Sequence, residues 1–197
     1  MPQRPNNPDI EVRAEAINLF LAAFDVFPSL AQKYLISRGF AKLNRDGKLQ
    51  PARAYIPLDP WLETFDAVLA DIGPNALFKI GQRIIGNPHF PVSVPGLESA
   101  LRTMDVAYHM SHRKGGAPMF EPQTTKMLEG IGHYVVRRAT KEKSISVECD
   151  TPYPCPLEHG MVTGVTGQVE PRAVVTHADP GRCRQKGADR CTYLVSW

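Results

Sequence analysis

The sequence predicts an α+β protein in which N-terminal helices pack on a C-terminal antiparallel sheet. Through residues 10–110, apolar side chains recur at helical spacing. After residue 110, short runs of β-branched and aromatic residues alternate with polar ones, which is typical of strands. One helical segment is inserted among these runs. Helices followed by strands in separate stretches of chain indicate the α+β class.

Helices are expected where this periodicity coincides with a start or stop signal. Pro28 and Pro60 suit the first turn of a helix, because the amide hydrogen that proline lacks is not needed there. The Gly73-Pro74 pair interrupts a helix. The expected helices cover residues 11–27, 28–40, 60–72, 75–85 and 95–110, and residues 44–57 are expected to form a loop.

Strands are expected within residues 133–150, 172–177 and 191–197, because β-branched and aromatic residues dominate there. A turn from Thr140 to Lys143 divides the first of these ranges into two strands. A short helix is expected between them, over residues 157–169, despite its glycines. We therefore expect one compact domain with a mobile leader (1–9), a helical part (10–110) and an antiparallel sheet part (111–197).

Composition narrows the function classes. The chain has 197 residues, 43% of them hydrophobic, which is enough for one domain with a proper core. The net charge is only +3, so no strongly basic surface is expected. Four basic residues do cluster near the C-terminus, but no aromatic residues are interleaved with them. We expect a solvated loop there rather than a polyanion site, and no clear nucleic-acid site. The cluster comprises Arg182, Arg184, Lys186 and Arg190.

Two further observations concern location. The sequence has no window of the ~18 apolar residues that a membrane span requires. The first residues, MPQRPNNPDIEVR, have no apolar run behind a basic start, so no secretory signal is expected. We expect a bacterial, cytoplasmic protein.

A Cys/His pattern in the last fifty residues predicts a metal site. Cys155, His177, Cys183 and Cys191 are separated by 21, 5 and 7 residues. In a reducing compartment, clustered cysteines are more often metal ligands than disulfides, and zinc takes four thiolate or imidazole ligands. Spacing alone leaves three alternatives open. Cys149 could replace Cys155, Asp179 could replace His177, and Cys183 could form a disulfide with Cys191.

Such a zinc ion is expected to be structural. A catalytic zinc keeps an open coordination position, whereas four protein ligands close the shell. We therefore expect the ion to pin a loop.

The same region resembles a known family. The stretches TPYPCPLEHGMVTG and VVTHADPGRCRQKGADRCTYLVSW resemble the 4-vinyl-reductase-like (4VR) domains. That family is related to phenol-sensor domains, haem–nitric-oxide-binding domains and vesicle-tethering subunits. The resemblance is best over residues 145–197 and weaker over 73–144. It includes Gly160, Gly164 and the Cys-x7-Cys pair.

The resemblance carries metal ligation to Cys155, Cys183 and Cys191. Phenol-sensor relatives use a glutamate as the fourth ligand, and Pro180 stands at that position here. His177 is therefore expected to replace the glutamate, with Asp179 as the alternative. The resemblance further implies a ligand-binding sensor with a pocket between helices and sheet, which acts through a partner or through its own homodimer.

Five residues are candidates for contact with a small hydrophobic or aromatic ligand: His109, Ser111, His112, Arg113 and Tyr134. Titratable groups at the mouth of an apolar site would orient such a ligand. The alternatives are that the two histidines cap a helix end and that the tyrosine is a core aromatic.

Haem is a secondary cofactor candidate. The Ser111-x-Arg113 pair resembles part of the Tyr-x-Ser-x-Arg motif that grips haem propionates in haem–nitric-oxide-binding domains, although His109 occupies the tyrosine position. That family also needs an upstream axial histidine, for which the sequence offers His89.

Three functions remain in order of preference. The first is a zinc-stabilised sensor or carrier of the 4VR type, without enzymatic activity. The second is a haem-binding gas sensor, or an enzyme acting on a tetrapyrrole or aromatic ligand, although the sequence has no Gly-rich dinucleotide fingerprint. The third is a scaffold subunit. Fold analogy alone does not decide among them.

Overall fold

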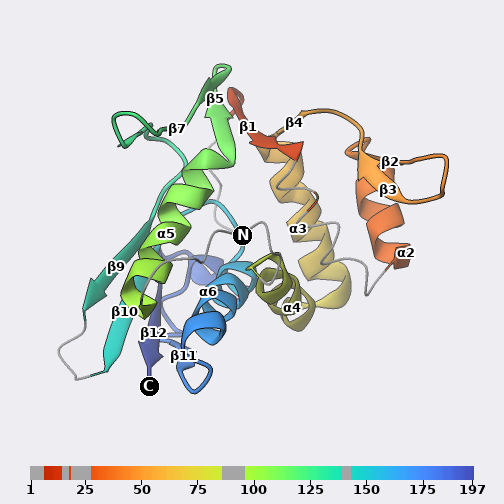
Figure 1. The fold of residues 1–197 in the computed structure, drawn as a ribbon. Helices are drawn as coiled ribbons and strands as arrows, with labels where there is room; N and C mark the ends of the chain where they lie inside the picture. Colours follow the sequence, from red (N-terminus) through yellow and green to blue (C-terminus); the bar gives the residue numbers. More distant parts are fainter. Residues whose placement is uncertain (1–6, 15–17, 19–27, 86–95, 139–142) are drawn as a thin grey trace.

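The computed structural model describes residues 7–14, 18, 28–85, 96–138 and 143–197 (Figure 1). Helices and antiparallel sheets together confirm the α+β class. Within these ranges, no helix is both long and apolar enough to cross a membrane. The predicted leader (1–9) and the predicted helix over 11–27 lie mostly outside the described residues.

The predicted helices between residues 58 and 110 are confirmed. Gly73 has a φ of 85°, and this left-handed conformation separates two of them. The next helix starts at Pro74, which the first turn of a helix tolerates. These helices are α3 (Leu58–Ile72), α4 (Pro74–Ile85) and α5 (Leu97–Met110).

The strands of the C-terminal part form one four-stranded antiparallel sheet in the order β11-β12-β10-β9. Its bounds agree with the predicted runs. In this register Cys149 of β10 lies opposite Cys191 of β12, and His177 of β11 lies opposite Tyr193 of β12. The strands are β9 (Tyr134–Arg138), β10 (Ser144–Cys149), β11 (Val174–His177) and β12 (Cys191–Ser196).

The inserted helix, α6 (Cys155–Val169), begins two residues before the predicted range. It lies against α4, in front of the sheet (Figure 1). Its glycines are explained by this crossing. A Cβ built on Gly160 would lie 2.1 Å from the carbonyl oxygen of Phe78, and one on Gly81 would lie 2.2 Å from that of Leu157. The two backbones approach too closely for a side chain at either position.

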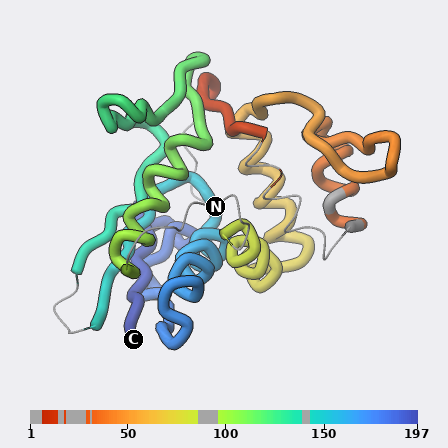
Figure 2. Tube along the Cα trace, in the orientation of Figure 1, coloured from red at the N-terminus to blue at the C-terminus, as the bar shows by residue number. Residues whose placement is uncertain are grey.

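The N-terminal part contains strands that the periodicity did not predict. Residues 10–13 were expected to begin a helix, but Ile10–Arg13 is a strand, β1. Ile10 and Val12 are buried in alternation with their neighbours because β1 pairs with β4 (Tyr55–Pro57) and β5 (His112–Lys114). Figure 2 shows β1 beside β5, a hundred residues further along the chain. Four residues are too few to distinguish a strand from a helical turn by periodicity.

Two other expectations require correction. The predicted loop over 44–57 contains β4 and one strand of a hairpin, β2 (Ala41–Leu43) with β3 (Leu49–Pro51). The predicted helix over 28–40 consists of α2 (Pro28–Ala31) and a π-helical turn that ends at Ile36. Two small strand pairs complete the described elements. They involve β6 (Ala117–Pro118), which pairs with β5, and β7 (Phe120–Glu121) with β8 (Lys126–Met127).

Candidate metal centre and ligand cavity

The structure brings Cys155, His177, Cys183 and Cys191 together. One ligand atom from each lies within 4.8 Å of those from the other three. The three cysteines are buried and His177 is partly buried. The Sγ atoms of Cys183 and Cys191 are 3.7 Å apart, and all four cysteines of the chain are free. This separation is too long for a disulfide bond of about 2.05 Å.

Secondary structure explains why the four side chains converge. Cys155 is the first residue of α6, His177 the last of β11 and Cys191 the first of β12. Cys183 precedes a 3-10 turn that ends at Gly187, where a φ of 91° reverses the chain. The termini of three elements and one tight loop therefore meet at a point.

Tyr193 packs against the Cys/His cluster. Its hydroxyl donates to the carbonyl oxygen of Cys155 at 2.8 Å. Its ring stacks on His159 and meets the ring of His177 edge-on, at centroid distances of 5.1 and 5.3 Å. Because Tyr193 is fully buried, these contacts restrict where the neighbouring ligand residues can lie.

The thiols of the cluster interact with one another. Hydrogen bonding from Cys155 lowers the pKa of Cys191, to which the backbone amide of Arg184 contributes at 3.5 Å, whereas the pKa of Cys155 is raised by its contact with Cys191 and by burial. Both ring nitrogens of His177 are buried without a hydrogen-bond partner among the described residues. Buried polar atoms are rarely left unpaired, so this donor set fits an ion that accepts nitrogen and sulfur ligands.

The two alternative ligands lie outside the group. Cys149 is fully buried in β10, between Tyr134 and Cys191 in the sheet register. The Asp179 carboxylate instead accepts the backbone amide of Gly181 at 2.8 Å. The structure thus assembles the set that contains Cys155 and His177.

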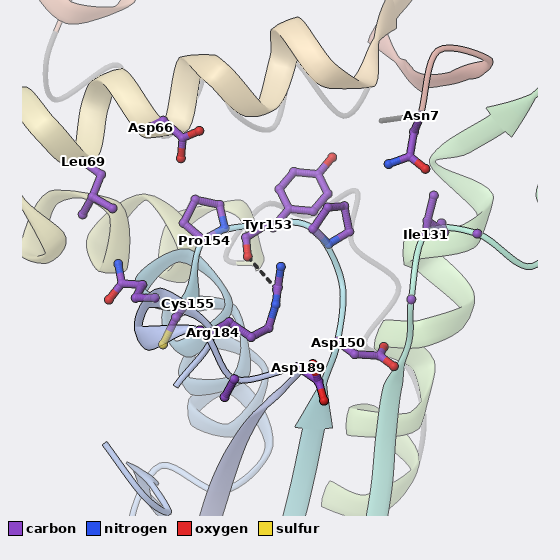
Figure 3. A pocket seen from close by; sticks show the side chains of 16 residues that line it. Asn7, Asp66, Leu69, Ile131, Asp150, Tyr153, Pro154, Cys155, Arg184 and Asp189 are labelled. Atoms are coloured by element: carbon purple, nitrogen blue, oxygen red, sulfur yellow. Dashed lines mark hydrogen bonds between the residues drawn. The ribbon is translucent and has the colours of Figure 1, made fainter. Parts of the chain in front are cut away.

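A cavity of about 360 Å³ adjoins the cluster. Figure 3 shows it between α3, the segment that leads into α6 and the loop after Cys183. Cys155 lines it, and so do five residues from the loop between Cys183 and Cys191. The remaining lining comes from Asn7, Asp66, Leu69, residues 130–132, Asp150 and residues 152–154.

Arg184 lies at the floor of this cavity (Figure 3). Its Nη1 donates to the carbonyl oxygen of Tyr153 at 3.0 Å and lies 3.5 Å from Oε1 of Glu158. Burial raises the pKa of Glu158 to about 8, although Arg184 and the hydroxyl of Thr151 oppose this shift. Arg184 thus connects the loop after Cys183 to the segment that precedes α6.

Three predicted ligand residues lie in a buried aromatic cluster and do not line this cavity. His109, His112 and Tyr134 are at most 3% exposed. Nδ1 of His112 donates to the carbonyl oxygen of Tyr108 at 2.7 Å, and its Nε2 accepts the hydroxyl of Tyr153 at 3.0 Å. Burial lowers the pKa of His112 to about 4, so this histidine is neutral.

The two remaining predicted ligand residues also lie elsewhere. The hydroxyl of Ser111 donates to the carbonyl oxygen of Ala107 at the end of α5. The guanidinium of Arg113 lies 3.3 Å from the ring centroid of Tyr55, and its Nε donates to Glu11 at 2.6 Å. Sequence reasoning missed Tyr153 and Arg184 as cavity residues. Their positions beside Cys155 and Cys183 were the available signal.

Comparisons of the chain with known proteins identify its fold. No family model matches the chain, and no curated protein matches it. An H-NOX protein from S. oneidensis in the Fe(II)NO state superposes with a TM-score of 0.61 at 13% identity, with 93% of this chain and 98% of that chain covered. The chain has the fold of H-NOX domains.

Two other H-NOX structures agree. F78L Tt H-NOX superposes with a TM-score of 0.59 at 16% identity, covering 93% of this chain and 94% of that one. The SO2144 H-NOX domain from Shewanella oneidensis, in the Fe(II)CO state, gives 0.60 at 14% identity, covering 93% and 97%. These similarities show the fold of H-NOX domains, the haem–nitric-oxide-binding domains to which the sequence analysis related the 4VR family.

Among the described residues, the lining of this cavity holds no histidine that could bind haem iron. Haem iron in proteins is held by histidine, cysteine, methionine or tyrosine. No histidine or methionine is among the described residues that line the cavity. Cys155 belongs to the thiol cluster, and the hydroxyl of Tyr153 is bound to His112. His89, the upstream histidine that the sequence offers for an axial position, lies outside the described residues.

Proposed function

We propose that this chain is a small-molecule sensor domain with the H-NOX fold, in which a structural zinc ion holds one wall of the ligand cavity. One observation carries the proposal. The loop between Cys183 and Cys191 supplies two of the four candidate zinc ligands and five residues of the cavity wall. A ligand in the cavity would therefore touch the same loop that the metal restrains.

Zinc would be held by Cys155, His177, Cys183 and Cys191. Held by these four side chains, the ion would supply a structural cross-link between the elements that carry them. Residues of the chain itself would carry the effect of a bound ligand to the metal centre. Arg184 follows one zinc ligand and holds the carbonyl group of Tyr153, two residues before another. Displacement of Arg184 by a ligand would shift both sides of the centre.

The cavity suits a small hydrophobic or aromatic ligand. Its volume lies at the lower end of the range for small-molecule sites. Leu69, Ile131, Pro152 and Tyr153 provide apolar walls, and Arg184 provides hydrogen-bond donors that would orient a polar end. We further propose that the chain is related to 4VR domains and that it signals from the cytoplasm through a partner or its own dimer.

The metal claim is tested by native mass spectrometry and Co²⁺ substitution. We expect a tightly held zinc ion, and thiolate-to-metal charge-transfer absorption after replacement by Co²⁺. Cys191→Ser should abolish this absorption. Cys149→Ser is the matched control, since Cys149 is equally buried and lies outside the group. Purified protein without zinc, or equal effects of the two variants, would contradict the proposal.

The ligand claim is tested with phenol, indole and benzoate as probes. We expect at least one of them to raise the melting temperature of the wild-type protein. Ala188→Phe, which fills the cavity, should abolish the shift, and Arg113→Met, which is remote from the lining, should retain it. An identical shift in both variants would place the binding site elsewhere.

Haem is the second candidate ligand, because the structural neighbours are H-NOX domains. Addition of haem to the purified protein distinguishes the two. A saturable, one-to-one Soret band would favour the gas-sensor function, and its absence would favour a ligand without iron.

A further inference from the structure

A second group of potential metal ligands lies between α5 and the start of β9. Asp105 and His109 are one turn apart on α5, and His133 immediately precedes β9. One ligand atom from each lies within 4.8 Å of those from the other two. None of the three belongs to the Cys/His cluster or to the described lining of the cavity. We propose that these three residues bind a divalent transition-metal ion.

The spacing is close to that of a coordination shell. With metal–ligand bonds of about 2.0–2.2 Å, adjacent ligand atoms in a tetrahedron are about 3.3–3.5 Å apart. Oδ2 of Asp105 lies 3.0 Å from Nδ1 of His133, close to this separation. Oδ1 lies 3.5 Å from Nδ1 of His109, which is the ring nitrogen opposite the one that would bind the ion.

His109 is held as a metal-binding histidine would be. Nδ1 lies 2.9 Å from the backbone carbonyl oxygen of Asp105, which can only accept a hydrogen bond. In the neutral tautomer that this contact selects, the hydrogen is on Nδ1 and the lone pair on Nε2. Nε2 is buried and has no hydrogen-bond partner among the described residues. Metal-binding histidines commonly donate their second nitrogen to a carbonyl group in this way, and an unpaired buried nitrogen is costly unless something binds it.

His133 provides the exposed side of the site. Its ring stacks on that of His109, with centroids 4.7 Å apart and an angle of 28° between the planes. Coordination of one ion by both rings requires the His133 ring to rotate. Its side chain is 25% exposed, so it has room to do so. The carboxylate of Glu129, which is 82% exposed, lies 3.1 Å from Nε2 of His133 and would orient the ring from the solvent side.

The donor set selects the class of ion. Two imidazoles and one carboxylate suit Zn²⁺, Ni²⁺, Co²⁺, Cu²⁺ or Fe²⁺, whereas Mg²⁺ and Ca²⁺ prefer oxygen ligands. Three protein ligands leave at least one position for water, so this ion would exchange more readily than one in the Cys/His centre. Asp105 also accepts the backbone amide of Tyr134 at 2.9 Å. This hydrogen bond already ties α5 to the first residue of β9, and the ion would add a second link from α5 to His133.

Titration of the full-length, zinc-loaded protein with Co²⁺ tests the proposal. We expect one additional ion per chain by native mass spectrometry, with weak d–d bands and without thiolate charge transfer. His133→Asn should weaken this binding by at least about tenfold. Because the His133 side chain is partly exposed, we expect the variant to fold. Arg102→Met is the control on the same helix, because Arg102 is exposed and pairs with Glu98. It should bind Co²⁺ as the wild type does.

Two results would overturn the proposal. One is the absence of an additional ion at free Co²⁺ concentrations on the order of 100 µM. The other is an additional ion that His133→Asn and His109→Gln both retain at wild-type affinity. Cys191→Ser separates the two metal sites, because it should lose the thiolate absorption and keep the additional Co²⁺ ion.

Discussion

Acid should destabilise this fold through His112 in particular. In the folded protein, burial of the side chain lowers the pKa of His112 to about 4 from an ordinary value of 6.5. Between these pH values the unfolded chain binds a proton that the folded chain does not. The stability that neutral His112 contributes is therefore fully present above about pH 6.5 and is lost as the pH falls towards 4.

The magnitude follows from the two pKa values. They differ by about 2.5, and each pKa unit corresponds to about 1.4 kcal/mol, so the whole effect is about 3 kcal/mol. Between about pH 7 and about pH 5, His112 alone should lower the free energy of unfolding by about 2 kcal/mol.

Urea denaturation at both pH values measures this effect. His112→Asn cannot titrate, and its amide can still donate to the carbonyl group of Tyr108. We expect it to be less stable than the wild type at neutral pH and to lose about 2 kcal/mol less on acidification. Tyr153→Phe removes the same side-chain hydrogen bond and keeps the imidazole, so its acid sensitivity should match the wild type. Metal loss at low pH affects all three proteins and cancels in the comparison.

The reasoning would be refuted if His112→Asn and the wild type lost equal stability between the two pH values. An NMR titration that gave His112 a pKa near 6.5 in the folded protein would refute it independently.

Three further predictions concern packing, ligand binding and the metal centre. Gly160→Ala should cost about 3 kcal/mol or more in urea denaturation, because its Cβ would collide with the backbone of α4. Gly167→Ala on the same helix should be neutral or gain up to about 1 kcal/mol, since nothing lies within 4 Å of its Cβ. Arg113→Met should leave binding of the aromatic probes unchanged in calorimetry, and a loss of binding would return Arg113 to the ligand site. Tyr193→Phe should weaken zinc binding about 10- to 100-fold in a chelator competition, because Cys155 loses the hydroxyl that holds its carbonyl group. Unchanged zinc affinity would show that this contact is dispensable.

The C-terminal part could largely be predicted because its signals are local. The alternation around Val147 and the β-branched run before His177 each describe a strand by themselves. Helix α6 was predicted, but the sequence did not explain why it contains glycines. Their reason is tertiary, since Gly160 is needed only because α4 crosses there. The prediction failed at Ile10–Arg13 for the same reason, because Val12 pairs with Ile56 and His112, which lie 44 and 100 residues further along the chain.

The sequence by itself determined the α+β class and the cysteine-rich character of the proposed metal centre, because residue type decides which ion a thiolate and imidazole cluster can hold. Only the tertiary structure decided that His177, and not Asp179, meets the three cysteines. It also places the cavity of about 360 Å³ beside the loop after Cys183, away from His109 and Tyr134. The physical reason is that a cavity is what side-chain packing leaves unfilled. The rings of His112, Tyr134 and Tyr153 pack around Tyr108, and no local sequence pattern indicates this packing.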